Sequence, residues 1–478
     1  MERKFFSKVI MTMTAAAVMG LASCSNENDP QIPEGEKGMP TEMSLTLNMN
    51  GVQTRVDQNP EQLPVGNYTT QAETEVKTLH VYIYDVASGL LDNKYDLNRY
   101  QDDGRTETGD ITYDNVAKTY TTKALKAFTG TKKVYVGLNL TTAMKNVLQK
   151  SSLQTLNTSA VTEELNNMIG ATGFSMFSPN GKESNFQEAT GVDVPAGNKV
   201  EINVERMVAK IGLGAKVKPT ELGAAGTLTD LQWVVDNIGK KFYMPATQKD
   251  PSMSADVWRA EDFLNNNFVN DNDWAGVKIV WNNLVENADR TQWTTAYSTE
   301  NFVNDNKLKG MTRVVVRGKY TPAQAVTYTL DTQGVLTPAQ IAITEGSTYY
   351  QIVVKGDDKF VFLAGPTLPA EDDVKAYYKK ITGQDYAGQN IMDECVKTYI
   401  NGYNYWWVTM AEQGQEGNVE RNHVYLANVN SIALPGRTEG KFNEDKDKDD
   451  ELDQETNIDI TVTVLDWAMV TFDANLKP

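Results

Sequence analysis

Side chains that could do chemistry are few in this sequence of 478 residues, and they lie far apart. The two histidines are His80 and His423, and the two cysteines are Cys24 and Cys395. No histidine lies near Cys395 in the sequence, so that thiol lacks the neighbouring base that a nucleophilic cysteine needs. We predict that Cys395 is a small buried or half-buried apolar residue and that neither histidine binds a ligand.

An acidic run from Glu444 to Glu455 places carboxylates at a spacing that suits a metal ion. The start of an EF-hand calcium loop is matched by Asp445, Asp447 and Asp449. That loop needs glycine at its sixth position and glutamate at its twelfth, where this chain has Asp450 and Thr456. We therefore expect no metal site here and predict that residues 444–456 are a solvated, flexible tether.

Motifs of the familiar enzyme classes are missing from the sequence. It contains no G-x-S-x-G, no H-E-x-x-H and no recurrent Cys/His spacing, and Gly181-Lys182 lacks the upstream glycine of a phosphate-binding loop. A scattered carboxylate pair, as in glycosidases, stays open at this point. The formal charge of −18 and the lack of a basic patch argue against a nucleic-acid partner. We predict a protein that is not an enzyme and carries no cofactor.

Aromatic residues offer one further kind of chemistry, the stacking of sugar rings. Along one expected strand, Tyr403, Tyr405 and Trp407 alternate with other residues. Such alternation is more typical of a buried core, which we favour here. The aromatic-rich stretch from Trp258 to Trp293 is the alternative place for a glycan.

The N-terminus carries the pattern of a targeting segment. Basic residues Arg3, Lys4 and Lys8 precede an apolar run from Val9 to Leu21, and Leu21-Ala-Ser-Cys24 resembles a bacterial lipobox. We predict that residues 1–23 are a signal peptide and that Cys24 is acylated, for example with palmitate, which would anchor the precursor to a membrane. An ordinary secretory peptide with a chance cysteine is the alternative.

Two stretches in which apolar and polar residues alternate are expected to form the strands on which the function of this protein depends. Near the C-terminus, apolar side chains alternate with polar ones at Ile458, Ile460, Val462 and Val464. Near the N-terminus, the same alternation places Met43, Leu45, Leu47 and Met49 on one face. Both patterns predict half-buried β-strands. Our hypothesis is that these two strands compete for one groove and that the competition makes the protein polymerise.

Between these ends, further strands and a few helices are expected. Strands are predicted at 76–85, 113–123, 132–140, 200–213, 228–236, 312–320, 348–355 and 359–363. Short helices are predicted within 141–170 and at 370–381. Residues 245–305 are predicted to form a long irregular segment between strands. Many short strands separated by turns predict a mostly β protein built of Greek-key β-sandwiches.

Several segments together resemble the fimbrillins that build type V pili in the Bacteroidetes, in particular the shaft subunit of the short (minor) fimbriae. Besides the lipobox, the resemblance is carried by Val204–Lys210, Leu228–Val235, Tyr403–Trp407, Glu420–Tyr425 and Ile460–Trp467. The order and spacing of these segments span nearly the whole chain. Within this resemblance, His423 belongs to a structural Arg-Asn-His-x-Tyr motif.

The resemblance implies two transthyretin-like β-sandwich domains with short inserted helices. It also implies export as an outer-membrane lipoprotein, cleavage by an arginine-specific protease between Arg55 and Val56, and polymerisation by donor-strand exchange. The expected divisions of the chain are a signal peptide at 1–23, a propeptide at 24–55, an N-terminal domain at 56–205, a C-terminal domain at 206–443, the tether at 444–456 and the donor strand at 457–478.

The predicted function is that of a structural fimbrial subunit that supports adhesion and biofilm formation. Its expected partners are copies of itself, accessory anchor and tip subunits, the protease, the outer membrane through the lipid, and surface ligands of a host or another bacterium. A tip or anchor subunit is one alternative, and a glycan-binding surface lipoprotein is another.

Overall fold

The computed structural model describes the chain in segments separated by gaps. The described residues are 38–48, 71–101, 103–117, 119–170, 173–218, 226–245, 257–258, 273–274, 277–278, 281–287, 293–302, 312–323, 325–333, 335–354, 361–364, 368–410, 419–432, 435–438 and 458–466. These residues are mostly β, with a few short helices, as the sequence predicts. Within them, no helix is long and apolar enough to span a membrane.

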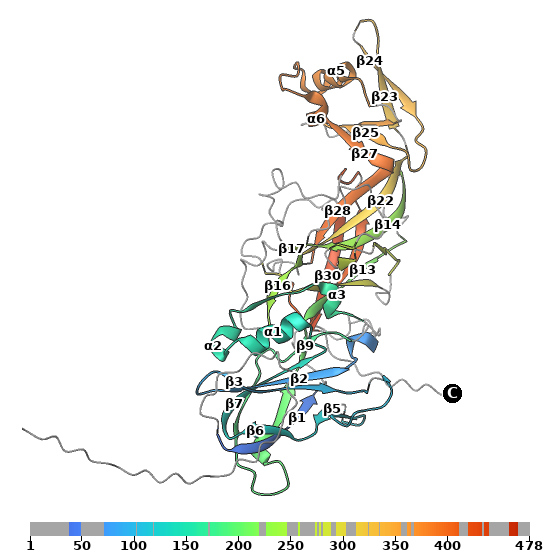
Figure 1. Ribbon diagram of the computed structural model, residues 1–478. Coiled ribbons are helices and arrows are strands. Elements are labelled where there is room, and N and C mark those ends of the chain that lie inside the picture. The colour runs from blue at the N-terminus through green and yellow to red at the C-terminus, as the bar shows by residue number, and fades with distance from the viewer. Residues whose placement is uncertain are drawn as a thin grey trace, which may run out of the picture. The chain divides into compact units, whose positions relative to one another are not determined.

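Residues before Met207 form two larger sheets (Figure 1). The first contains β11 (Lys199–Asn203), β1 (Pro40–Asn48), β5 (Thr119–Thr122) and β4 (Ile111–Asp114) in that order, and β6 (Leu125–Phe128) also pairs with β1. The second contains β12 (Glu205–Arg206), β9 (Met176–Phe177), β7 (Gly130–Leu138), β2 (Thr78–Asp85) and β3 (Leu91–Asn98), and β10 (Lys182–Phe186) pairs with β7. Alternating burial in β11 and β6 shows that one face of the first sheet is turned to a core.

Residues from Val208 onward form two further four-stranded sheets. One is ordered β21 (Thr294–Thr299), β13 (Val208–Ala215), β29 (His423–Ile432) and β30 (Ile458–Asp466). The other is ordered β20 (Asn282–Asn283), β14 (Gly226–Asp236), β22 (Arg313–Pro322) and β28 (Tyr403–Thr409). Most residues of β13 and β22 are buried on both faces, as expected for central strands covered on each side.

Small sheets and short helices complete the described chain. The small sheets pair β8 (Ala160–Thr162) with β16 (Lys241–Tyr243), β15 (Ile238–Gly239) with β17 (Val257–Trp258), β18 (Asp273–Trp274) with β19 (Val277–Lys278), β23 (Ala325–Leu330) with β24 (Leu336–Ile341), and β25 (Tyr349–Ile352) with both β26 (Val361–Ala364) and β27 (Val396–Tyr399). The α-helices are α1 (Thr142–Lys150), α2 (Leu153–Leu156), α3 (Leu165–Met168), α5 (Glu371–Thr382) and α6 (Ile391–Cys395). The helices expected within 141–170 and at 370–381 are therefore confirmed.

Three sequence predictions are wrong in detail. The single strand expected at 200–213 is divided into β11, β12 and β13, which lie in three different sheets. The expected strand over 113–123 is a hairpin of β4 and β5, because Oδ1 of Asp114 accepts hydrogen bonds from the backbone N–H groups of Val116 and Ala117 and so forms a turn. The expected irregular segment at 245–305 contains β21, which pairs with β13 along six register positions. No strong alternation marks β21, whose burial pattern is intermediate along most of its length.

A buried ionic contact joins the strands on either side of Met207. Glu73, in the short turn η2 (Gln71–Glu73), is fully buried. Its Oε1 accepts hydrogen bonds from Nζ of Lys210 at 2.8 Å and from the hydroxyl of Tyr297 at 2.5 Å, and its backbone carbonyl accepts one from Nε of Arg206 at 3.1 Å. Burial lowers the pKa of Lys210, although the Glu73 carboxylate opposes that shift. The contact therefore links η2 to both β12 and β13.

Candidate functional site

Strand β1 lies inside a sheet and pairs on both of its sides. It runs parallel to β11, with Leu45 opposite Val200 and Leu47 opposite Ile202. On its other side it is antiparallel first to β6 and then to β5. We call the position between β11 on one side and β5 and β6 on the other the β1 slot. A segment from the start of the chain therefore completes a sheet whose other strands begin at residue 111.

The inward face of β1 is deeply buried. Met43, Leu45 and Leu47 each have 0% exposure. Their neighbours on the flanking strands are the buried side chains of Tyr120, Leu125, Val200 and Ile202. Three predicted members of the displaced strand therefore share one buried face, and Met49, the fourth, lies outside the described residues.

A threonine side chain bridges the point where β1 changes partner. Pairing with β6 ends at Met43 opposite Leu125, and pairing with β5 begins at Thr46 opposite Thr121. Between these positions, Oγ1 of the buried Thr122 accepts a hydrogen bond from the backbone N–H of Leu45 at 3.1 Å. The hydrogen bond of Thr122 involves a backbone N–H group and no side chain of β1. A strand with a different sequence in the slot can therefore make the same hydrogen bond. Sequence analysis missed Thr122, whose one signal is a polar residue at an inward position of β5.

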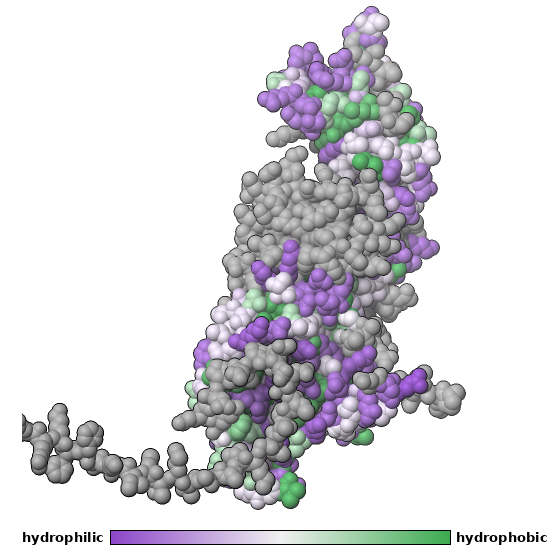
Figure 2. Space-filling model, in the orientation of Figure 1, coloured by the Kyte–Doolittle hydropathy of each residue, from purple (hydrophilic) through white to green (hydrophobic). Residues whose placement is uncertain are grey.

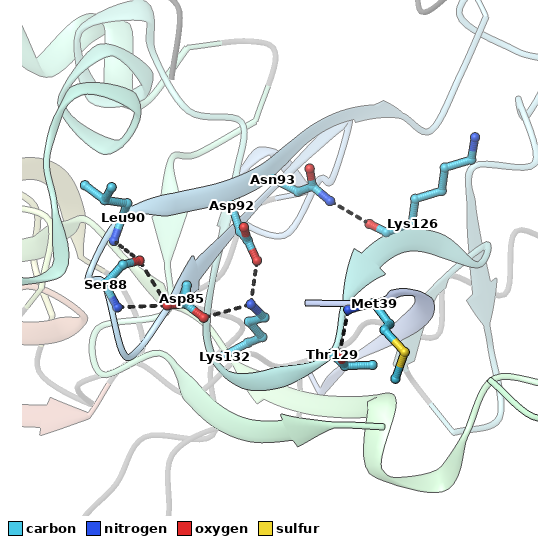
Figure 3. Close-up of polar contacts among 9 residues, drawn as sticks. All are labelled: Met39, Asp85, Ser88, Leu90, Asp92, Asn93, Lys126, Thr129 and Lys132. Atoms are coloured by element: carbon cyan, nitrogen blue, oxygen red, sulfur yellow. Dashed lines mark hydrogen bonds and ion pairs between the residues drawn. The ribbon is translucent and has the colours of Figure 1, made fainter. Parts of the chain in front are cut away.

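The chain enters the slot by a close approach to β6 and β7. A Cβ atom on Gly38 would lie 2.4 Å from the carbonyl oxygen of Thr129, so glycine is required there. The next residue, Met39, donates its backbone N–H to Oγ1 of Thr129 at 2.9 Å (Figure 3). From β3, Nδ2 of Asn93 donates to the carbonyl of Lys126 at 3.0 Å, which ties β6 to the second sheet (Figure 3).

A buried cation holds the second sheet together beside this entry. Lys132 is 1% exposed, and its Nζ lies 2.6 Å from Oδ2 of Asp92 and 2.9 Å from Oδ2 of Asp85 (Figure 3). Burial opposes ionisation of Asp85, but hydrogen bonds from Lys132 and Ser88 outweigh it and lower the pKa of the Asp85 carboxyl. The group therefore stays ionised near neutral pH and fixes β2, β3 and β7 relative to one another.

The other alternating stretch, β30, lies at the end of a sheet. It is antiparallel to β29 from His423 opposite Asp466 to Ile432 opposite Ile458. Among the described residues β29 is its one pairing partner. The predicted donor residues Ile458, Ile460, Val462 and Val464 all lie in this strand. The structure thus brings each predicted strand into a sheet of its own chain, and the two strands occupy different sheets.

The predicted processing sites and the predicted tether lie outside the described residues. These are the lipidation site Cys24, the cleavage site formed by Arg55 and Val56, and the acidic tether at 444–456.

Of the remaining reactive side chains, both histidines have structural partners. In β2, the buried His80 places Nδ1 2.5 Å from Oδ1 of Asp96 and Nε2 3.1 Å from Oγ1 of Thr78. In β29, Nδ1 of His423 lies 2.8 Å from the backbone carbonyl of Arg421. Cys395 is free and buried, as predicted, and burial raises the pKa of its thiol.

The segment from Glu420 to Tyr425 contains the turn before β29 and the first residues of that strand. Arg421 is buried, and its guanidinium pairs with the Glu300 carboxylate and donates to the carbonyl of Met244 at 3.0 Å. The hydroxyl of Tyr425 accepts a hydrogen bond from the backbone N–H of Glu420 at 2.8 Å. This arrangement agrees with the structural role predicted for the motif.

The core placement favoured from the sequence is seen for Tyr405, one of the three alternating residues of β28. Tyr405 and Trp406 are buried, whereas Tyr403 is half-buried. The guanidinium of Arg317 lies 3.8 Å from the Trp281 ring and 5.3 Å from the Tyr403 ring, an internal cation–π contact. Side-chain placement for Trp407 and for Trp258 lies outside the described set. Figure 2 shows a largely hydrophilic described surface in that view, with apolar residues gathered in small areas.

Comparison with known proteins gives one family match and several structural likenesses. Residues 397–473 match the family described as major fimbrial subunit protein type IV, fimbrillin, C-terminal. No curated protein matches the chain. A solved structure described as a cell adhesion protein from Parabacteroides distasonis has 13% identity and a TM-score of 0.45, over 90% of this chain and 99% of that one. The tip fimbrial protein Mfa3 from Porphyromonas gingivalis, with C-terminal truncation, has 12% identity and a TM-score of 0.39, over 89% of this chain and 100% of that one.

The family match covers most of β27 and all of β28, β29 and β30, and therefore includes the four predicted donor residues. A match to a family of major fimbrial subunits over these strands supports a role as a fimbrial subunit. It also points to a structural protein rather than an enzyme.

Proposed function

We propose that this protein is a structural shaft subunit of a bacterial surface fimbria that polymerises by donor-strand exchange. The observation that carries the proposal is the place of β1, an interior strand joined to β2 through residues 49–70. Arg55 lies within that connection. One backbone cut there would turn an internal strand into a separate peptide held by non-covalent contacts alone.

The binding of β1 is strong enough to require a cut before exchange. Three fully buried apolar side chains contribute about 1.5 to 3 kcal/mol each, and each ladder hydrogen bond adds roughly 0.5 to 1.5 kcal/mol. The sum is on the order of 10 kcal/mol before the entropy of ordering the strand is subtracted. While the connection is intact, its short length also keeps the local concentration of β1 high. Cleavage removes that advantage and lets another strand replace β1.

The C-terminal strand of a second copy is the replacement that we propose. Ile458, Ile460, Val462 and Val464 repeat the apolar alternation of β1. In the β1 slot this strand would gain ladders with β11 on one side and with β5 and β6 on the other, instead of the single described ladder with β29. Because the slot and the donor strand are different surfaces of one chain, the contact does not close on itself and generates a filament.

Export and assembly follow the same proposal. Acylation at Cys24 anchors the precursor to the outer membrane, and an arginine-specific protease cuts between Arg55 and Val56. The residues from Val56 onward then enter a filament with anchor and tip subunits, which serves adhesion and biofilm formation.

The experiment uses residues 25–478, which include every described residue. The purified protein is treated with an arginine-specific protease, and its mass and particle length are followed. An Arg55→Ala variant controls for cutting elsewhere, and a variant that ends at residue 456 lacks the donor strand. We expect cleavage after Arg55 and filaments with the unmodified protein alone.

Two outcomes would contradict the proposal. A protein that is cut after Arg55 and stays monomeric would indicate a tip or anchor subunit that caps filaments, or a surface lipoprotein that binds glycans. Filaments that form without residues 457–478 would place the donor segment elsewhere in the chain. Binding of the uncut Arg55→Ala monomer to a glycan array would favour the glycan-binding alternative.

A further inference from the structure

A buried asparagine contacts the first residues of β1. Asn198 ends the short turn η3 (Ala196–Asn198) and has 0% exposure. Its Nδ2 donates to the carbonyl of Glu42 at 2.8 Å, to Oγ1 of Thr41 at 3.1 Å and to the carbonyl of Gln187 at 2.9 Å. Its Oδ1 accepts from the backbone N–H of Gln187 at 2.8 Å. The side chain therefore joins β1 to the segment that precedes β11.

Thr41 completes this polar group from within the strand. It is 6% exposed and lies on the same face of β1 as Met43. Its hydroxyl donates to the carbonyl of Gln187 at 2.8 Å and accepts from Asn198. An apolar side chain in its place would leave that carbonyl and the Asn198 amide each with one partner fewer, which is costly in a buried site. The slot therefore favours a hydroxyl at its first inward position.

The two alternating stretches match at this position as well as at their apolar residues. The first reads Thr41-Glu-Met-Ser-Leu-Thr-Leu-Asn-Met49, and the second reads Thr456-Asn-Ile-Asp-Ile-Thr-Val-Thr-Val464. When they are aligned from their first residues, Thr41 coincides with Thr456. Thr46 then coincides with Thr461, and all four apolar positions coincide.

Other alignments lose this agreement. A shift by one residue turns the apolar side chains to the opposite face. A shift by two in one direction places Ile458 where Thr41 binds Asn198, and it places Asp466 in the position of Met49. A shift by two in the other direction places Thr456 in the fully buried position of Met43.

We infer that Asn198 and the Gln187 carbonyl set the register of the incoming strand by binding the hydroxyl of Thr456 from a second copy of this chain. Ile458, Ile460 and Val462 then occupy the positions of Met43, Leu45 and Leu47. Thr122 binds the backbone of whichever residue takes the place of Leu45. Asn198 is a positioning residue in this scheme. The inference rests on the proposed donor-strand exchange. It adds which residues of the two subunits contact each other.

Cysteine pairs test the register directly. Thr46 lies opposite Thr121 of β5, so Thr461 of the incoming strand should lie opposite Thr121 of its neighbour. Three double variants of residues 25–478 combine Thr121→Cys with Asp459→Cys, Thr461→Cys or Thr463→Cys. Each is polymerised under reducing conditions and then oxidised. Thr46→Cys with Thr121→Cys in the uncut protein is the control that this site accepts a disulfide.

We expect the Thr461→Cys pair to cross-link neighbouring subunits at least about tenfold more than the other two pairs. Filaments that cross-link preferentially through Asp459→Cys or Thr463→Cys would overturn the register and leave the proposed function intact. Protein that is cut after Arg55 but forms no filaments in the unsubstituted chain would overturn the proposed function, and the register with it.

A second measurement tests how much the hydroxyl of Thr456 contributes to subunit binding. Thr456→Val keeps the shape of the side chain and removes its hydrogen bonds, and Asn198→Ala removes the partner. We expect each to speed dissociation of subunits from filaments about tenfold, and to spread cross-linking over neighbouring registers. Thr461→Val is the matched control, because Thr46, its counterpart, lies on the opposite face from Thr41. Equal dissociation rates for Thr456→Val and Thr461→Val would contradict a role for Asn198 and Thr456 in setting the register.

Discussion

Strands β1 and β30 have similar patterns of apolar and polar residues but different surroundings. Strand β1 pairs on both sides, and three of its side chains are fully buried. Strand β30 pairs on one side among the described residues, at the end of its sheet. An alternating sequence therefore fixes which face of a strand is buried, whereas its position in the sheet decides how strongly it is held. A strand at an edge can leave at lower cost and can gain a second ladder elsewhere.

Proline substitutions should show the largest difference in stability between variants of β1 and variants of β30. Thr46→Pro removes a backbone donor from a strand paired with both β5 and β11, so we expect the free energy of unfolding to fall by at least about 1 to 3 kcal/mol, the cost of the acceptor left without a partner. In β30, adjacent backbone N–H groups point to opposite sides, so one of Thr461→Pro and Val462→Pro should be tolerated. Urea unfolding of the uncut Arg55→Ala protein measures these effects. Equal losses at all three positions would show that β30 is held as firmly as β1.

A cavity in the β1 slot should have the next largest effect. Leu45→Ala truncates a fully buried side chain and should lower the free energy of unfolding by about 2 to 5 kcal/mol. Ser44→Ala, the neighbouring position on the opposite face, is the matched control, and its effect should stay within about 0.5 kcal/mol. Urea titration of the two uncut variants compares them. A loss of less than 1 kcal/mol for Leu45→Ala would contradict tight packing of β1.

Acid should produce the smallest effect, on the sheet that faces the entry to the slot. The folded pKa of Asp85 lies below its unfolded value, so its stabilising contribution is complete above about pH 4. That contribution is lost as the pH falls through the folded pKa. Hydrogen exchange of peptides from β2 and β29, measured from pH 7 to pH 3, should show the larger acid-induced loss of protection in β2. Asp85→Asn should remove this difference in protection between β2 and β29. If the difference is unchanged in that variant, other carboxyl groups are responsible for the acid effect.

Much of the secondary structure could be predicted from the sequence, because it depends on local patterns. Alternation in 76–85, 132–140 and 228–236 corresponds to β2, β7 and β14. The inward face of β1 was predicted from the same rule, and its three described residues are buried. The hairpin of β4 and β5 was missed because one Asp114 side chain forms its turn.

The polar side of the candidate site could not be predicted, because it depends on residues far apart in the chain. Leu45 lies opposite Val200, and Asn198 bonds to Glu42. No periodicity links such positions. Asn198 also lies in a short turn after Pro195, a place where an asparagine is common for local reasons. Its role becomes visible once the sheet brings it against β1.

The parallel alignment of β1 and β11 has a mechanical consequence for the proposed filament. A donor strand in the orientation of β1 would be pulled from its N-terminal end, where its tether leads back to its own subunit. Strand β11 would be pulled from its C-terminal end, since the chain continues there into β12 and β13. Two parallel strands loaded at opposite ends slide past each other, and their hydrogen bonds share the force instead of breaking one after another. Tension along the fimbria would therefore load each junction in shear, the direction in which a β-ladder resists best.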